Sequence, residues 1–275
     1  MWSGRGRPIP NPVLRPERFD EEESVMHITT RGLVLRETAY KEADKILTIL
    51  TEEGGKRTVK ARGCRRKGSV LAAPSQLLVW SDMTLFEYRE RFNLHEAATL
   101  EEFRGLRGDL EKLALGSYFA EANETAAQEG VPQPELLSLI LNSLYALDRL
   151  DKPAALVKAA FELRLLCEAG YEPMAECCAV CGAVEPEDPR LDLSQGMLHC
   201  AHCPAQSGGG ISMPLTPAAL GALRYIIGAN PKRFLSFELA GEGLKRLADL
   251  AEAYLMTQLE RGFRTLDFYK SIRLD

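Results

Sequence analysis

Long hydrophobic runs and histidines are both scarce in this chain of 275 residues. No apolar stretch approaches the roughly 20 residues that a helix needs to cross a bilayer, so no membrane partner is expected. The first residues lack the apolar core of a secretory signal, which favours a cytoplasmic protein with reduced thiols. Only four histidines are present, and we find neither a phosphate-binding glycine loop nor an H-E-x-x-H arrangement. These absences argue against a nucleotide-hydrolysing or metal-dependent enzyme.

The chain as a whole has no excess of positive charge: its formal net charge is −5. A negative chain is by itself a poor partner for nucleic acid. The charges are unevenly distributed, however. Residues 26–100 carry 13 lysines and arginines against 9 acidic residues, whereas residues 101–175 carry 7 against 13. A basic N-terminal part on an acidic body predicts two surfaces with different partners.

The N-terminal third of the chain changes character at residue 26. Residues 1–25 contain four prolines and an acidic run without periodicity, which predicts a disordered extension. Residues 26–100 contain segments rich in β-branched and aliphatic residues, separated by turn signals. Five short antiparallel strands in this length predict an OB-fold barrel that could bind DNA. The strands are expected at residues 32–36, 44–51, 56–62, 77–88 and 92–99.

From residue 101 to residue 275 the hydrophobic period is about 3.6, which predicts an all-α helical domain. A loop-rich segment, at about residues 174–212, interrupts it and contains two C-x-x-C pairs. The predicted class is therefore α+β and multidomain: a five-stranded OB-fold barrel followed by a helical domain with an inserted four-cysteine module. Helices are expected at residues 109–128, 134–150, 153–169, 217–229 and 241–262.

The two cysteine pairs are the most specific motif in the chain. They read Cys178-Ala-Val-Cys181 and Cys200-Ala-His-Cys203, with eighteen residues between them. This spacing is typical of one Zn²⁺ ion held by four thiolates. A closed shell of four thiolates leaves no position for water or substrate, so the predicted role of the metal is to fold the segment.

Other readings of these cysteines stay open at this point. The chain has seven cysteines, and the four could form disulfides or remain buried thiols. Cys177 could replace Cys178, although it would give the less usual C-x-x-x-C spacing, and His199 and His202 flank the second pair. The odd number of cysteines and the expected reducing compartment favour zinc over disulfides.

Basic residues are concentrated between residues 56 and 67, where no acidic residue occurs. They cover a predicted strand and a loop at residues 62–68, expected to be exposed and mobile. Such a cluster suits a phosphate backbone, although lysines that guard an edge strand are the structural alternative. Of the barrel aromatics, only Tyr40 is expected outside the core, so little base recognition is predicted. The candidate contacts are Lys56, Arg57, Lys60, Arg62, Arg65, Arg66 and Lys67.

Several motifs, taken in their order along the chain, resemble one bacterial protein family. The N-terminal motifs resemble the start of the RecO family of DNA repair proteins, and the later ones are similar to its zinc-bearing members. The resemblance covers about residue 26 to the C-terminus. The motifs are Arg31-Gly-Leu-Val-Leu-Arg36, the run from Tyr40 to Thr51, Gly55-Lys56, Ala61-Arg-Gly63, Ser69-Val-Leu-Ala-Ala73, and Ala169-Gly-Tyr-Glu-Pro173 ahead of the cysteine pairs.

The resemblance implies a recombination mediator of the RecF pathway and not an enzyme, with no catalytic residue. Such a protein binds single- and double-stranded DNA and anneals complementary strands. It works with RecR and with the C-terminal tail of single-stranded DNA-binding protein (SSB), and thereby helps to load RecA on SSB-coated strands. It would be cytoplasmic and nucleoid-associated. Carried onto this sequence, the resemblance adds Arg31 to the candidate DNA contacts.

The resemblance also implies a site for the SSB tail, which is acidic and ends in apolar residues. That tail needs an apolar pocket with a basic rim, and the candidates are Arg149, Lys152, Lys158 and Arg164. Two other classes stay open: a nuclease or ligase, and a zinc-ribbon protein that binds RNA or acts in translation. Magnesium-dependent cleavage would favour the first, and a preference for RNA over single-stranded DNA would favour the second.

Overall fold

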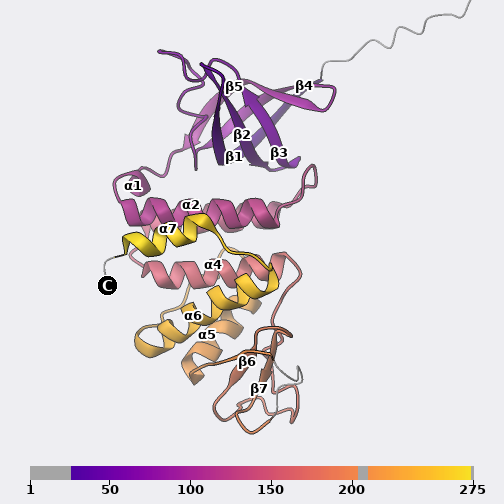
Figure 1. Cartoon of the computed structure of the whole chain (residues 1–275), viewed down its shortest axis with the longest axis vertical. Coiled ribbons are helices and arrows are strands. Elements are labelled where there is room, and N and C mark those ends of the chain that lie inside the picture. The colour runs from indigo at the N-terminus through magenta and orange to yellow at the C-terminus, as the bar shows by residue number, and fades with distance from the viewer. Residues whose placement is uncertain (1–25, 204–209, 274–275) are drawn as a thin grey trace, which may run out of the picture.

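The computed structural model describes residues 26–203 and 210–273. The predicted disordered extension at residues 1–25 lies outside the described residues. Figure 1 shows a β-barrel at one end of the molecule, layers of helices in the middle and a small β-module at the other end. Over the described ranges, no helix has both the length and the apolar character needed to cross a membrane.

The N-terminal part is a closed barrel with strand order β1-β2-β3-β5-β4, in which β4 pairs back onto β1. The β3–β5 pairing is parallel and the other pairings are antiparallel. This topology confirms the predicted five-stranded OB-fold. The strands are β1 (Met26–Tyr40), β2 (Asp44–Thr51), β3 (Gly55–Ala61), β4 (Trp80–Tyr88) and β5 (Arg91–Glu101).

Strand β1 is much longer than the predicted segment at residues 32–36. Its first half pairs with β4 and its second half with β2, and a bulge between Val34 and Arg36 lies near the change of partner. Only its middle, from Gly32 to Leu35, is continuously buried. The two ends of β1 contain too few apolar residues for the sequence to predict a strand there. They are part of the strand because they pair with β4 and β2.

The helical domain contains all five predicted helices and two that were not predicted. The unpredicted α1 has only four residues, too few to show a helical period, and α7 has nine, of which Leu266 and Tyr269 are buried. The helices of the described chain are α1 (Arg104–Arg107), α2 (Leu110–Ala126), α3 (Pro134–Arg149), α4 (Ala154–Glu168), α5 (Pro217–Gly228), α6 (Gly241–Gln258) and α7 (Arg264–Ile272).

The barrel and the helical domain share one hydrophobic core. Leu33 and Leu50 of the barrel belong to the same buried cluster as Leu115 and Phe119 of α2. A second cluster, which includes Leu47 of β2, fills the inside of the barrel. Because apolar surface is buried between the two parts, the barrel is seated on α2, as Figure 1 shows.

The cysteine segment forms a separate module beyond α4. Its short strands make a sheet in the order β7-β6-β8, and the strands are β6 (Arg190–Asp192), β7 (Met197–His199) and β8 (Ser212–Pro214). Three-residue strands bury little surface, so this sheet needs another source of stability. The module lies at the end of the molecule opposite the barrel (Figure 1).

Candidate nucleic-acid interface and metal centre

The four predicted cysteines lie together in the module. The sulfur atoms of Cys178, Cys181, Cys200 and Cys203 are all within 4.8 Å of one another. Cys178 and Cys200 are buried, and Cys181 Sγ lies 3.6 Å from Cys200 Sγ. Four sulfurs at this separation form a donor set that could hold one metal ion.

Backbone amides surround Cys178 as expected for a thiolate in a metal knuckle. Burial opposes ionisation of this thiol, but hydrogen bonds from the N–H groups of Cys181, Val180 and Cys200 outweigh it and lower its pKa to about 6. The Cys200 N–H lies 3.4 Å from the Cys178 sulfur. Gly182, with φ of +74°, closes the turn in a conformation that a glycine adopts without strain. The fit to a metal therefore rests on geometry and on hydrogen bonding.

The neighbouring alternatives lie outside the thiolate cluster. Cys177 is exposed and is not among the clustered sulfurs. His199 is buried; its Nδ1 donates to the carbonyls of Cys200 and Cys203 at 3.0 and 3.1 Å, and its Nε2 lies 2.9 Å from the hydroxyl of Ser212. This imidazole ties β7 to β8 and braces the second cysteine turn.

Side chains of α5 and α6 hold the module on the helical domain. Arg224 of α5 donates to the carbonyls of Ala175, Glu176 and Val184, the first at 2.7 Å. Gln258 of α6 donates to the carbonyl of Leu193 at 2.7 Å. These anchors have no signature in the sequence, because an arginine that binds carbonyls cannot be told there from any surface arginine.

The basic loop is the first part of an 18-residue connector, residues 62–79, between β3 and β4. Cys64 and Leu71 are buried in the barrel cluster. The N–H of Gly63 donates to Asp44 at 2.8 Å, and the N–H of Arg65 donates to the carbonyl of Ala43 at 3.0 Å. The loop is exposed as predicted, and buried side chains and these hydrogen bonds attach it to the barrel.

The candidate DNA contacts separate into paired and open cations. Arg31 pairs with Asp82 at 3.2 Å and with Glu52 at 3.7 Å, and Lys60 pairs with Asp44 at 3.0 Å. Arg57 lies over the ring of Phe92, 4.3 Å from its centroid. Among the candidate contacts, Arg62, Arg65, Arg66 and Lys67 are exposed, and no acidic group of the described residues lies within 4 Å of them.

Lys56 binds the helical domain instead of facing outward. Its Nζ donates to the carbonyl of Glu124 in α2 at 2.8 Å. Its backbone N–H donates to the carbonyl of Gln128, and its carbonyl accepts from Gly130 at 3.0 Å. These bonds join β3 to the segment after α2. Lys56 therefore belongs to the junction between barrel and helices, and we do not retain it as a DNA contact.

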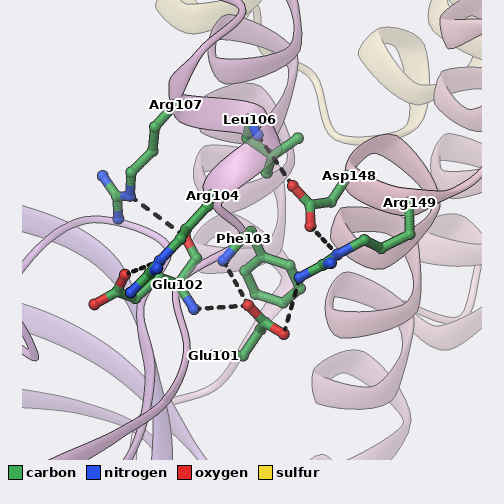
Figure 2. Close-up of polar contacts among 8 residues, drawn as sticks. All are labelled: Glu101, Glu102, Phe103, Arg104, Leu106, Arg107, Asp148 and Arg149. Carbon is green, nitrogen blue, oxygen red and sulfur yellow. Dashed lines mark hydrogen bonds and ion pairs between the residues drawn. The ribbon is translucent and has the colours of Figure 1, made fainter.

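Arg149, a candidate for the rim of the tail site, lies at the linker between barrel and helices (Figure 2). It forms an ion pair with Asp148 and lies 3.8 Å from Glu101. Glu101 accepts hydrogen bonds from the backbone of Glu102 and Phe103, and Asp148 accepts from the N–H of Leu106 at 3.1 Å. The guanidinium is still about half exposed. Its ion pairs help to set the direction in which the chain leaves the barrel.

The other three rim candidates are placed very differently from one another. Lys158 is buried between Glu162 at 2.7 Å and Glu252 at 2.9 Å, so the expectation of a surface position is wrong for this residue. Arg164 is also mostly buried, paired with Glu168 and bonded to the carbonyl of Ile227. Lys152 is half-buried, with its Nζ 3.1 Å from the carbonyl of Phe237. Only Arg149 and Lys152 keep surface available to a partner.

A closed five-stranded barrel with this order, with open cations on one connector, is the architecture of an OB-fold nucleic-acid-binding protein. The family model described as "Recombination protein O N terminal" matches residues 26–103, and "Recombination protein O C terminal" matches residues 107–267. The two matches meet at the linker that Figure 2 shows.

Curated relatives agree with these matches. The chain is 30% identical over 246 residues to the DNA repair protein RecO of Acetivibrio thermocellus, covering 90% of this chain and 97% of that protein. It is 34% identical over 252 residues to the RecO of Anaeromyxobacter sp. (strain K), covering 88% and 95%. The chain belongs to the RecO family of DNA repair and recombination proteins.

Proposed function

We propose that this protein anneals complementary DNA strands and helps to load the RecA recombinase on SSB-coated single-stranded DNA. Its membership of the RecO family supports a role in DNA repair and recombination. The observation that carries the proposal is the cluster of open cations on the β3–β4 connector: Arg62, Arg65, Arg66 and Lys67. Arg57 adds a fifth cation at the adjacent strand.

The proposed mechanism is electrostatic. Two complementary strands repel each other through their phosphates, and a surface that binds one or both backbones lowers this repulsion. Each phosphate contact releases counterions, which favours binding at low salt. Base pairing then supplies the free energy of annealing, so the step needs no catalytic residue. The hydrogen bonds and buried side chains that attach the connector to the barrel support this role, because less conformational entropy is lost when an attached surface binds.

We propose Zn²⁺ as the metal that Cys178, Cys181, Cys200 and Cys203 would hold. Thiolate sulfur is a preferred zinc ligand, and four thiolates leave no open coordination position. When bound, the ion would act as a structural cross-link for the small sheet of the module. The distance of the module from the barrel supports a role in folding and not in DNA contact.

The proposed partners are DNA, RecR and the C-terminal tail of SSB, with RecA acting downstream. Arg149 and Lys152 remain the candidates for binding the acidic tail, because Lys158 and Arg164 are mostly buried. A role in repairing chromosomal DNA would place the protein in the cytoplasm, at the nucleoid.

The deciding experiment is annealing of complementary oligonucleotides coated with SSB. We expect the protein to anneal strands coated with full-length SSB and to lose most of this activity when the SSB lacks its C-terminal tail. Strands without SSB serve as the control, and the protein should anneal them as well. Equal annealing with both forms of SSB would contradict the proposed use of the tail, and failure on bare strands would contradict annealing itself.

A further inference from the structure

Four residues form a row across the outer face of the barrel. His27 of β1 is in register with Phe86 of β4, Phe86 with Asn93 of β5, and Asn93 with Lys60 of β3. Partners in register point to the same side of a sheet. Leu85 and Leu94, the neighbours of Phe86 and Asn93, are buried inside the barrel, so the row faces outward.

Three aromatic rings from three strands lie on this face: those of His27 and Phe86 in the row, and that of His95 next to it. The ring of His27 lies 4.0 Å from that of Phe86, and the ring of Phe86 lies 5.4 Å from that of His95, centroid to centroid. His95 is the unpaired residue of a β5 bulge, which follows from the register change between Thr84 and Leu85 of β4. Both histidines are exposed and Phe86 is half-buried. Exposed rings contribute little to the barrel core, whereas flat rings facing outward can stack on other flat rings.

A cavity of about 390 Å³ opens beside these rings. Its apolar lining includes Leu71 of the connector and Leu94 of β5. Its polar lining includes Arg62, the first cation of the connector, and Asn93, whose amide can both donate and accept. His95 Nε2 lies 3.9 Å from the exposed carboxylate of Glu96. The cavity thus combines an aromatic wall, an amide and a cation.

We propose that this cavity receives an unpaired base of single-stranded DNA while Arg62 binds an adjacent phosphate. Because the rings of Phe86 and His95 are inclined at 69° to each other, the base stacks on the face of one ring and meets the other ring edge to face. The inference rests on the proposed binding of single strands and adds a second mode of contact to it. A base offers a π-face to the rings and hydrogen-bonding groups to Asn93. Every base has such a face, so the contact is independent of sequence.

Stacking on these rings also distinguishes single strands from duplex. In a duplex both faces of a base are covered by its neighbours, and only an unpaired base can enter the cavity. Phosphate contacts by Arg65 and Arg66 do not discriminate in this way. The cavity would therefore give the protein a preference for unpaired DNA that electrostatic attraction alone does not supply.

The test compares a thymidine oligonucleotide with one of equal length and charge made of abasic sites. Stacking of one base is worth about a five- to 150-fold gain in affinity, so the native protein should bind the thymidine strand more tightly by that order. In the variant H27A/H95A, or in F86L, the two strands should approach equal affinity, with abasic binding and its salt dependence unchanged. A fluorescent 2-aminopurine in the strand should be quenched by the native protein and not by the variants.

Tyr145→Ala is the matched control, because this tyrosine is exposed on α3 and does not line the cavity. It should bind both strands like the native protein. Equal binding of both strands by the native protein, or loss of affinity for both in H27A/H95A, would overturn the stacking site. If neither strand binds at all, the proposed function itself fails, which is a different result. Both histidines are exposed, so we expect H27A/H95A to fold even if F86L does not, and the test then rests on the double variant.

Discussion

Lys56 Nζ donates a 2.8 Å hydrogen bond to the main-chain carbonyl of Glu124, so a lysine of the barrel is bound to the backbone of α2. Next to it, Gly55 has φ of +61°, and a Cβ built on Gly55 would lie 1.9 Å from the carbonyl oxygen of Val131. The barrel and the helical domain therefore approach each other backbone to backbone here, and a lysine in the basic run serves that contact.

Replacing Lys56 by methionine should lower stability and leave DNA binding almost unchanged. The variant loses a hydrogen bond with a charged donor, which is worth about 1.5–3 kcal/mol. Gly55→Ala should be more damaging, because a Cβ at that position requires the barrel to move away from residues 128–131. Denaturant unfolding and oligonucleotide binding measure the two properties separately. A large loss of DNA affinity in a folded K56M protein would restore Lys56 as a DNA contact.

Charge reversal of Arg65 and Arg66 should weaken DNA binding roughly tenfold or more. Each lost phosphate contact flattens the dependence of log K on log salt by about 0.7 on single strands, so the double variant should lose about 1.4. A salt titration with a single-stranded oligonucleotide measures the slope. The matched control is Lys232→Glu with Arg233→Glu, an exposed pair in the helical domain that changes the net charge equally. Unchanged slopes for R65E/R66E would rule out the connector as the DNA surface.

Asp44→Asn should strengthen DNA binding a few-fold at low salt. Its carboxylate accepts from the Gly63 N–H and pairs with Lys60, and the two interactions, the first the larger, lower the pKa of Asp44 below 3.8. Any stability from this carboxylate is present above that pH and is lost as the pH falls through the lowered value. An asparagine keeps an acceptor for Gly63 but releases Lys60 to bind a phosphate. Weaker binding by D44N would show that the anchoring of the loop by Asp44 matters more for DNA binding than the release of Lys60.

Removal of the metal should loosen the module and the helical domain while the barrel keeps most of its DNA affinity. Cys200→Ser removes one ligand, and Cys177→Ser, an exposed thiol outside the cluster, is the control. Elemental analysis should find one zinc per native or C177S chain and much less in C200S. Unfolding curves and DNA binding then show which part of the molecule responds. A parallel loss of barrel function would contradict this division of roles.

Lys158→Met should cost about 3–5 kcal/mol, because it leaves the carboxylate of Glu162 buried without its cation. Burial raises the pKa of Glu162, and a raised carboxyl pKa gives stability that is lost as the pH rises through it. The loss should therefore be larger at pH 8 than at pH 5. The double variant K158M/E162Q removes the buried charge and keeps an acceptor for Tyr118, so it should be more stable than K158M alone. A pH-independent loss would contradict this explanation.

The sequence by itself determined the parts of the molecule and their order. Period-two and period-3.6 patterns separated the barrel from the helices, because each pattern buries one face of its element. The C-x-x-C spacing fixed the thiolate cluster, because two residues between ligands form a turn that directs both sulfurs to one point. These are local constraints, and a local pattern is sufficient to express them.

Tertiary structure alone decided which charges are open and which rings face outward. Lys56, Lys60 and Lys158 look alike in the sequence, yet their partners are a carbonyl of α2, Asp44 of the adjacent strand, and a buried pair of glutamates. Phe86 was assigned to the core by strand alternation, whereas the register places it on the outer face beside His27. Whether a cation is paired, or a ring exposed, depends on which residues of other segments lie next to it. Those neighbours are set by how the barrel closes and how it packs on α2.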